Sequence, residues 1–234
     1  MTDDTTPTTA PAAPATAETS PDAISLRAPS KYLAAGTATA AGPSGTSTSF
    51  VAPSTEWLSG TWAVTHSTLS MWGSAQNVRI TYTPRQPAAG ADGNGPAVND
   101  NLVEYENKGG RGGVKRVLGV EKPDPAVPGA WNWRGRGLLM IASSHWEVLG
   151  WGERPLAGGE GGVERWAVTW FAPTLFTEEG LDLYSDRREG LSKRTADDIL
   201  AALKRLEAAP KLVQLVEKKM TEVAISLPWK EGSK

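Results

Sequence analysis

Apolar and polar positions alternate along short segments from about Trp57 onward, and this pattern predicts antiparallel strands. Successive side chains of a strand point to opposite faces, so each segment has one apolar and one more polar face. Residues 61–68, for example, place Trp62, Val64 and His66 on one face. Eight segments show this behaviour, at residues 61–68, 77–83, 102–106, 114–120, 130–134, 138–143, 145–151 and 163–171. Short strands separated by turns rich in glycine and proline are typical of an all-β barrel or sandwich.

The period of the pattern changes to that of a helix in the C-terminal part of the chain. Ser192 has the residue type and position of an N-cap. Apolar residues then recur every three or four positions in two stretches, 199–206 and 212–220, with Pro210 between them. We expect two short helices, or one broken helix, packed on the outside or the open end of the β-structure.

The first 52 residues differ in composition from the rest of the chain. They consist mainly of Thr, Ala, Pro, Ser and Gly, so little apolar surface is available to offset the entropy of ordering the backbone. We expect a disordered tail over 1–52, in which only residues 24–33 carry apolar side chains able to dock locally. The predicted organisation is this tail, a β-domain over 53–190 and a helical segment over 191–234.

Composition narrows the classes of partner and the expected compartment. The formal net charge is −2, which gives no general attraction to nucleic acid. No run of residues is long and apolar enough for a membrane-spanning helix, and the N-terminus lacks the features of a secretory signal. The chain has no cysteine, so disulfides and thiolate ligands are excluded. A cytoplasmic protein without a nucleic-acid partner or a membrane span is expected.

Tryptophan is unusually frequent, with ten residues against three phenylalanines. An indole covers a large apolar area and also offers one N–H donor, so it suits both a packed core and the wall of a ligand cavity. The predicted aromatic lining consists of Trp72, Tyr82, Tyr105, Trp146, Trp166 and Trp170.

The first predicted strand resembles that of lipocalins and their calycin relatives, in which a Gly-x-Trp motif opens the strand. Here the matching residues are Gly60 and Trp62. The fuller pattern resembles lipocalin-like proteins of filamentous fungi with no assigned activity, at residues 65–72, 77–82, 133–137, 143–150 and 166–177. This resemblance implies an all-β fold with C-terminal helices, namely an antiparallel lipocalin-like barrel of about eight or more strands. It also implies that Trp62 lies at the packed end of the barrel. In such barrels an arginine usually stacks on this tryptophan, but the sequence shows no clear counterpart of that arginine.

Polar candidates for the interior are few. His66 shares a predicted face with Trp62. Arg134, if it projects inward, could bind a carboxylate or an enolate, or it could instead stack on an aromatic ring. Arg79 is a candidate of the same kind. The predicted ligand-binding residues are therefore His66, Trp72, Arg79, Tyr82, Tyr105, Trp133, Arg134, Trp146, Trp166 and Trp170.

Three functions fit this sequence. The first is binding of a small, largely apolar or aromatic molecule in a tryptophan-lined cavity. The second is a cofactor-independent isomerase or cyclase of secondary metabolism that uses the same cavity, and the third is a structural or interaction protein with a filled barrel. No cofactor or metal is expected. Haem is disfavoured because His66 and His145 are the only histidines, and the haem ligand of similar barrels usually lies later in the chain.

Overall fold

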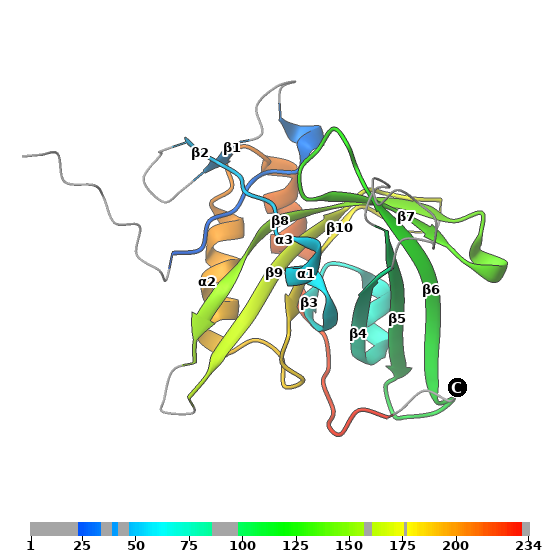
Figure 1. Cartoon of the computed structure of the whole chain (residues 1–234). Coiled ribbons are helices and arrows are strands. Elements are labelled where there is room, and N and C mark those ends of the chain that lie inside the picture. Colours follow the sequence, from blue (N-terminus) through cyan, green and yellow to red (C-terminus); the bar gives the residue numbers. More distant parts are fainter. Residues whose placement is uncertain are drawn as a thin grey trace, which may run out of the picture.

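Eight antiparallel strands form a closed barrel in the computed structural model, which describes residues 23–33, 39–41, 47–85, 98–156, 161–175 and 177–230. The strands are β3 (Gly60–Ser67), β4 (Ala75–Pro84), β5 (Asn99–Asn107), β6 (Val114–Pro123), β7 (Ala130–Gly135), β8 (Ser143–Pro155), β9 (Val163–Phe171) and β10 (Gly180–Ser185). Each strand pairs with the next along the chain, and β10 returns to pair with β3 (Figure 1). Closed up-and-down barrels of eight strands are the architecture of lipocalins. The predicted fold class is confirmed.

Short elements complete the barrel. The helix α1 (Thr55–Leu58) precedes β3, and the two-residue strand β11 (Thr221–Glu222) pairs with the C-terminal end of β3, at Ser67 and His66. Strands β1 (Thr39–Ala41) and β2 (Ser47–Ser49) form a separate hairpin. Three 3₁₀ turns are present, η1 (Ser30–Tyr32), η2 (Ser70–Ser74) and η3 (Gly137–Leu139). None of the helices in the described part of the chain is long and apolar enough to cross a membrane.

The number of strands was predicted correctly, although one predicted strand is absent and one observed strand was missed. Residues 138–143 form η3 and a turn instead of a strand, after Gly137 with φ of 60°. Strand β10 was missed because its alternation is hidden. All six of its residues are buried, since its outer side chains lie under the helices and its inner ones face the barrel.

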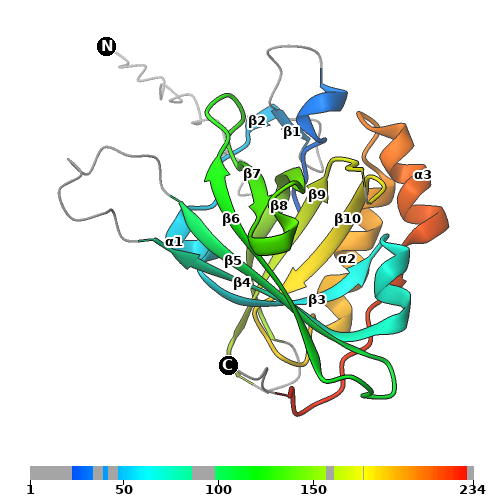
Figure 2. The same ribbon diagram turned by 90° about the vertical axis from the view of Figure 1, so that its right-hand side faces the viewer.

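Two helices cover the outside of the barrel, as predicted. They are α2 (Lys193–Lys204) and α3 (Pro210–Lys219), and both lie beside β9 and β10 (Figure 2). The hydroxyl of Ser192 accepts a hydrogen bond from the backbone N–H of Thr195, which confirms the predicted N-cap. Pro210 does more than interrupt the pattern, because it occupies the first turn of α3, where its missing N–H costs nothing. The outer core joins apolar residues of both helices to those of the strands: Leu149, Trp166, Val168, Trp170, Leu181, Leu183, Ile199, Leu203, Leu212 and Val216.

An N-terminal segment, residues 23–33, adds a further layer on this face. Leu26 is buried in the outer core, and the backbone N–H of Arg27 donates to the carbonyl of Leu149 over 2.8 Å. Composition placed this segment in a tail expected to be disordered apart from local docking of residues 24–33, and its apolar side chains do dock it on β8. Gly150 permits the close approach, because a Cβ there would lie 2.6 Å from the carbonyl oxygen of Ser25. Residues 1–22 of the predicted tail lie outside the described residues.

One end of the barrel is packed solid around Trp62. This indole is fully buried, and its Nε1 donates to the carbonyl of Leu58 in α1 over 2.7 Å. The guanidinium of Arg165 lies 5.0 Å from the Trp62 ring and 5.5 Å from the Trp57 ring, and it donates to the carbonyl of Trp57. Arg165 is therefore the arginine that stacks on this tryptophan, and its counterpart was not evident from the sequence.

Candidate functional site

The other end of the barrel contains a cavity of about 320 Å³. That volume is at the lower end of the range typical of small-molecule sites, which is about 300–1,000 Å³. Strands from all sides of the barrel and the turns at its mouth contribute to the lining, which includes Leu69, Met71, Trp72, Ile80, Tyr82, Asn101, Val103, Val117, Glu121, Trp133, Leu139, Ala142, Trp146, Thr169, Phe171, Asp182 and Tyr184. The barrel is therefore only partly filled by its own side chains.

Aromatic rings form much of the cavity wall. Trp146 stacks on Trp131 with ring centroids 4.5 Å apart and on Tyr82 at 5.7 Å. Trp72 contacts Tyr105 edge to face at 5.2 Å. These contacts hold the rings in place from behind, so the faces that border the cavity are preorganised.

Two buried carboxyl groups line the same cavity. Glu121 on β6 accepts a hydrogen bond from Nε1 of Trp146 over 3.2 Å, and Asp182 on β10 accepts one from the hydroxyl of Ser67 over 2.5 Å. Burial raises the pKa of the Glu121 carboxyl to about 8, and the hydrogen bond from Trp146 only partly opposes this. Burial likewise raises the pKa of Asp182 to about 7, against the hydrogen bond from Ser67. Both carboxyls therefore titrate near neutral pH.

Two phenols, those of Tyr82 and Tyr184, line the same cavity as the carboxyls. The hydroxyls of Tyr82 and Tyr184 are hydrogen-bonded to each other, and both tyrosines interact electrostatically with Glu121 and Asp182. Burial is the main cause that raises the pKa of both phenols above the ordinary value, and the neighbouring acidic groups add to it. Both tyrosines therefore stay neutral at physiological pH. Together the four residues make one acidic and phenolic cluster inside an aromatic cavity, which we call the acid cluster.

Two polar atoms of the lining have no hydrogen-bond partner among the described residues. They are Oε2 of Glu121 and Nε1 of Trp72, and each belongs to a side chain that is at least nine-tenths buried. Unsatisfied buried polar groups are rare in folded proteins because each costs free energy. Both atoms are therefore available to a bound molecule.

Four of the predicted ligand-binding residues line the cavity: Trp72, Tyr82, Trp133 and Trp146. Tyr105 is absent from the lining but supports Trp72 from the side. Whether these residues bind a ligand stays a prediction.

His66 does not face the interior, contrary to the predicted face. In the pairing with β10, Leu183 lies opposite His66 and Tyr184 lies opposite Val64, so Thr65 is an extra residue in β3. Such a β-bulge reverses the alternation of side chains beyond it. His66 consequently points outward, where Glu222 of β11 lies 3.9 Å from its ring.

Both predicted arginines also lie outside the barrel. Arg79 pairs with Glu104 on the outer face at 3.1 Å and lies under the ring of Trp229. The side chain of Arg134 is exposed, and its Nε donates to the carbonyl of Met140 over 3.1 Å. The prediction of Arg134 and Arg79 as polar groups of the interior is thus wrong.

Trp166 and Trp170 belong to the outer core and not to the cavity lining. Their neighbours on β9, Ala167 and Thr169, are the ones that face inward. Alternation in β9 was recognised correctly, but the larger side chains pack under the helices. The inward face of this strand carries Ala167 and Thr169, with Phe171 at its end.

The acid cluster was not predicted from the sequence. Glu121 lies at the end of a strand whose inner positions, Val117 and Gly119, gave no sign of a polar site. Asp182 lies in β10, which the alternation did not reveal as a strand. The available indication was that Glu121 and Asp182 occupy inward-facing positions in the alternation of their strands. This indication is useful only once β10 has been recognised as a strand.

The rim of the cavity carries exposed apolar side chains. Met71 and Leu139 line the cavity and are also 44% and 40% exposed. Leu138 and Ile141, in the same turn as Leu139, are exposed almost completely. An apolar rim of this kind suits the entry of an apolar molecule.

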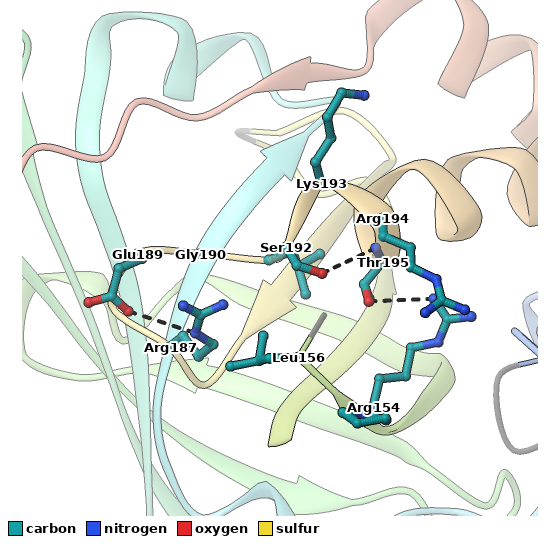
Figure 3. A pocket seen from close by; sticks show the side chains of 11 residues that line it. Arg154, Leu156, Arg187, Glu189, Gly190, Ser192, Lys193, Arg194 and Thr195 are labelled. Atoms are coloured by element: carbon teal, nitrogen blue, oxygen red, sulfur yellow. Dashed lines mark hydrogen bonds and ion pairs between the residues drawn. The ribbon is translucent and has the colours of Figure 1, made fainter. Parts of the chain in front are cut away.

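A second pocket, of about 400 Å³, lies outside the barrel at the start of α2 (Figure 3). Its lining includes cationic residues whose charges are balanced by the chain itself. Arg154 pairs with Asp198, Arg187 with Glu189 and Lys193 with Asp197. The barrel cavity, with its unpaired polar atoms, is the stronger candidate for a binding site.

Comparison with known proteins gives similarity only to solved structures. No family model matches the chain, and no curated protein sequence is similar to it. Among the similar structures are apocrustacyanin C1 (12% identity, TM-score 0.43) and lobster apocrustacyanin A1 (13%, 0.40), each covering 72% of this chain and 78% of its own. A third is the siderocalin Ex-FABP (14%, 0.43), which covers 73% of this chain and 95% of its own. At these identities and scores none of them assigns a ligand to this chain, and the lipocalin-like architecture rests on the closed eight-stranded order of its own strands.

Proposed function

We propose that the protein binds a small, largely aromatic molecule inside its barrel. The observation that carries this proposal is the 320 Å³ cavity, which is walled by aromatic rings and has one packed and one accessible end. A filled barrel, working only as a structural or interaction module, would leave no such space. The proposal includes a cytoplasmic location and the resemblance to lipocalin-like proteins of filamentous fungi, both of which stay predictions.

Filling the cavity should weaken binding. Val103→Phe adds a ring to the wall, and we expect it to weaken binding of the neutral probe 3-ethylindole about tenfold or more. Isothermal titration calorimetry on the full chain measures the affinity, and thermal unfolding without the probe shows that the variant is folded. Arg134→Ala, which alters an exposed residue outside the barrel, is the control and should bind as the parent does. If the parent binds no indole, neutral or charged, or if V103F binds 3-ethylindole as tightly as the parent does, the proposal is wrong.

A second candidate function, isomerisation or cyclisation without a cofactor, is supported by the acid cluster. A carboxyl that titrates near neutral pH can both donate and accept a proton at physiological pH. Glu121 and Asp182 have this property inside a cavity from which a ligand would exclude water. An isomerase would convert a bound metabolite into a product of equal mass with a different retention time. Chromatography with mass detection checks this, and Glu121→Gln should then stop conversion.

A further inference from the structure

The ionisable side chains of the described cavity lining are all acidic. Two of the lining residues are carboxylic acids, and none of the described lining residues is lysine, arginine or histidine. The cations nearest in the sequence to the acid cluster, such as Lys122 beside Glu121, alternate to the outer face of their strands. No basic side chain of the described lining therefore offsets the negative charge that Glu121 and Asp182 carry when they ionise.

The hydrogen bonds of Glu121 leave one of its oxygens unused. Oε1 accepts from Trp146, whereas Oε2 has no partner among the described residues although the side chain is only 2% exposed. When Glu121 is ionised, Oε2 can accept a hydrogen bond from a bound molecule. Tyr82, Trp133 and Trp146 line the same cavity as Glu121, and the faces of aromatic rings attract cations. A group that carries a positive charge and N–H donors satisfies both features at once.

We propose that the natural ligand is an organic cation, namely a protonated amine on an aromatic or apolar body, whose ammonium group pairs with Glu121 and Asp182. This inference rests on the proposed binding function and specifies its ligand class. The apolar body would contact Trp72, Trp133 and Trp146, and the ammonium group would lie at the acid cluster. Tyr82 and Tyr184 would offer their hydroxyl oxygens as further acceptors.

Binding of a cation should release protons. Glu121, Asp182, Tyr82 and Tyr184 are the titratable groups of the described lining. The carboxyls are partly protonated at pH 7 in the empty cavity, because burial raises the pKa of Glu121 to about 8 and that of Asp182 to about 7. A bound ammonium group favours their ionised forms. The affinity for an amine that stays protonated should therefore rise between pH 6 and pH 8, whereas a neutral ligand should show no such rise.

The test compares two probes that share one ring system and differ in charge. Tryptamine is a cation and tryptophol carries a hydroxyl in place of its ammonium group. We expect tryptamine to bind the full chain about tenfold or more tightly than tryptophol, since hydrogen bonds to charged groups are the stronger ones. Calorimetry at pH 7 in two buffers of different ionisation enthalpy should show net proton release for tryptamine only.

Variants of the acid cluster assign the effect to its residues. Glu121→Gln should reduce tryptamine binding about tenfold and leave tryptophol binding nearly unchanged, and Asp182→Asn should act in the same direction. Glu222→Gln removes the same charge from an exposed position outside the barrel and is the matched control. If tryptophol binds as tightly as tryptamine, or if E121Q keeps the preference for the cation, the ligand class is wrong while the binding function stands. If neither probe nor 3-ethylindole binds, the binding function itself is wrong.

Discussion

Replacing Trp62 with alanine is expected to lower the free energy of unfolding by about 3–5 kcal/mol, the typical cost of removing a large buried aromatic side chain. Trp62 is fully buried at the packed end, where the Arg165 guanidinium covers its ring and its indole N–H bonds to Leu58. The substitution leaves a cavity and an unpaired carbonyl, and it removes one of the two rings against which the Arg165 guanidinium lies. Chemical denaturation followed by circular dichroism measures the loss.

Trp133→Ala is the matched control for this prediction. Trp133 is also a tryptophan on a barrel strand, but it is only half-buried and already borders empty space. Its removal enlarges an existing cavity, so we expect a clearly smaller loss of stability than for W62A. Equal losses for the two variants would contradict the division of the barrel into a packed end and a cavity end.

Glu147→Gln should lower the free energy of unfolding by about 3–5 kcal/mol, because it leaves a buried arginine without its counter-charge. Arg27 and Glu147 have side chains that are 1% and 0% exposed, and they pair at 2.7 Å. The Glu147 carboxylate also accepts hydrogen bonds from the backbone and hydroxyl of Ser30. Losing it should weaken the docking of residues 23–33 on β8. Urea denaturation at pH 7 measures the change in stability.

Two comparisons test the cause of that loss. The double variant Arg27→Met with Glu147→Met replaces the pair by apolar side chains and should be more stable than E147Q alone. The exposed substitution Glu222→Gln should change stability by less than about 1 kcal/mol. A loss below about 1 kcal/mol for E147Q would refute the proposed role of the ion pair.

The contribution of Glu147 should also depend on pH. Burial alone would raise the pKa of this carboxyl, but hydrogen bonds from His145 and Ser30 and the charge of Arg27 lower it from 4.5 to about 2. A carboxyl whose pKa is lowered by folding stabilises the protein above its unfolded pKa, and this contribution is lost as the pH falls through the folded value. The difference in stability between the parent and E147Q should therefore shrink from pH 4.5 toward pH 2.

The strands and the aromatic wall could be predicted because they depend on local alternation. Trp72, Tyr82 and Trp146 were assigned to the lining from their own segments, and the structure places all three there. Alternation separates two faces of a strand but does not say which is inward. The helices cover the outer face of β9, so the large apolar side chains of Trp166 and Trp170 are buried outside the barrel.

The acidic part of the site could not be predicted because it depends on long-range geometry. Glu121 and Asp182 come from strands on different parts of the barrel, and only its closure brings them to one cavity. His66 was placed on the wrong face because one extra residue, Thr65, shifts the register of β3. A bulge of this kind leaves no mark in the pattern of apolar and polar residues.

Fluorine NMR of the chain labelled with 5-fluorotryptophan tests the central claim, that the barrel cavity is the binding site. The ten tryptophans give ten resonances, which single Trp→Phe substitutions assign. On addition of saturating tryptophol, the resonances of Trp72, Trp133 and Trp146 should shift, and those of Trp166 and Trp170 on the outer face should stay in place. Shifts confined to Trp166 and Trp170, or three unmoved cavity resonances, would contradict the claim.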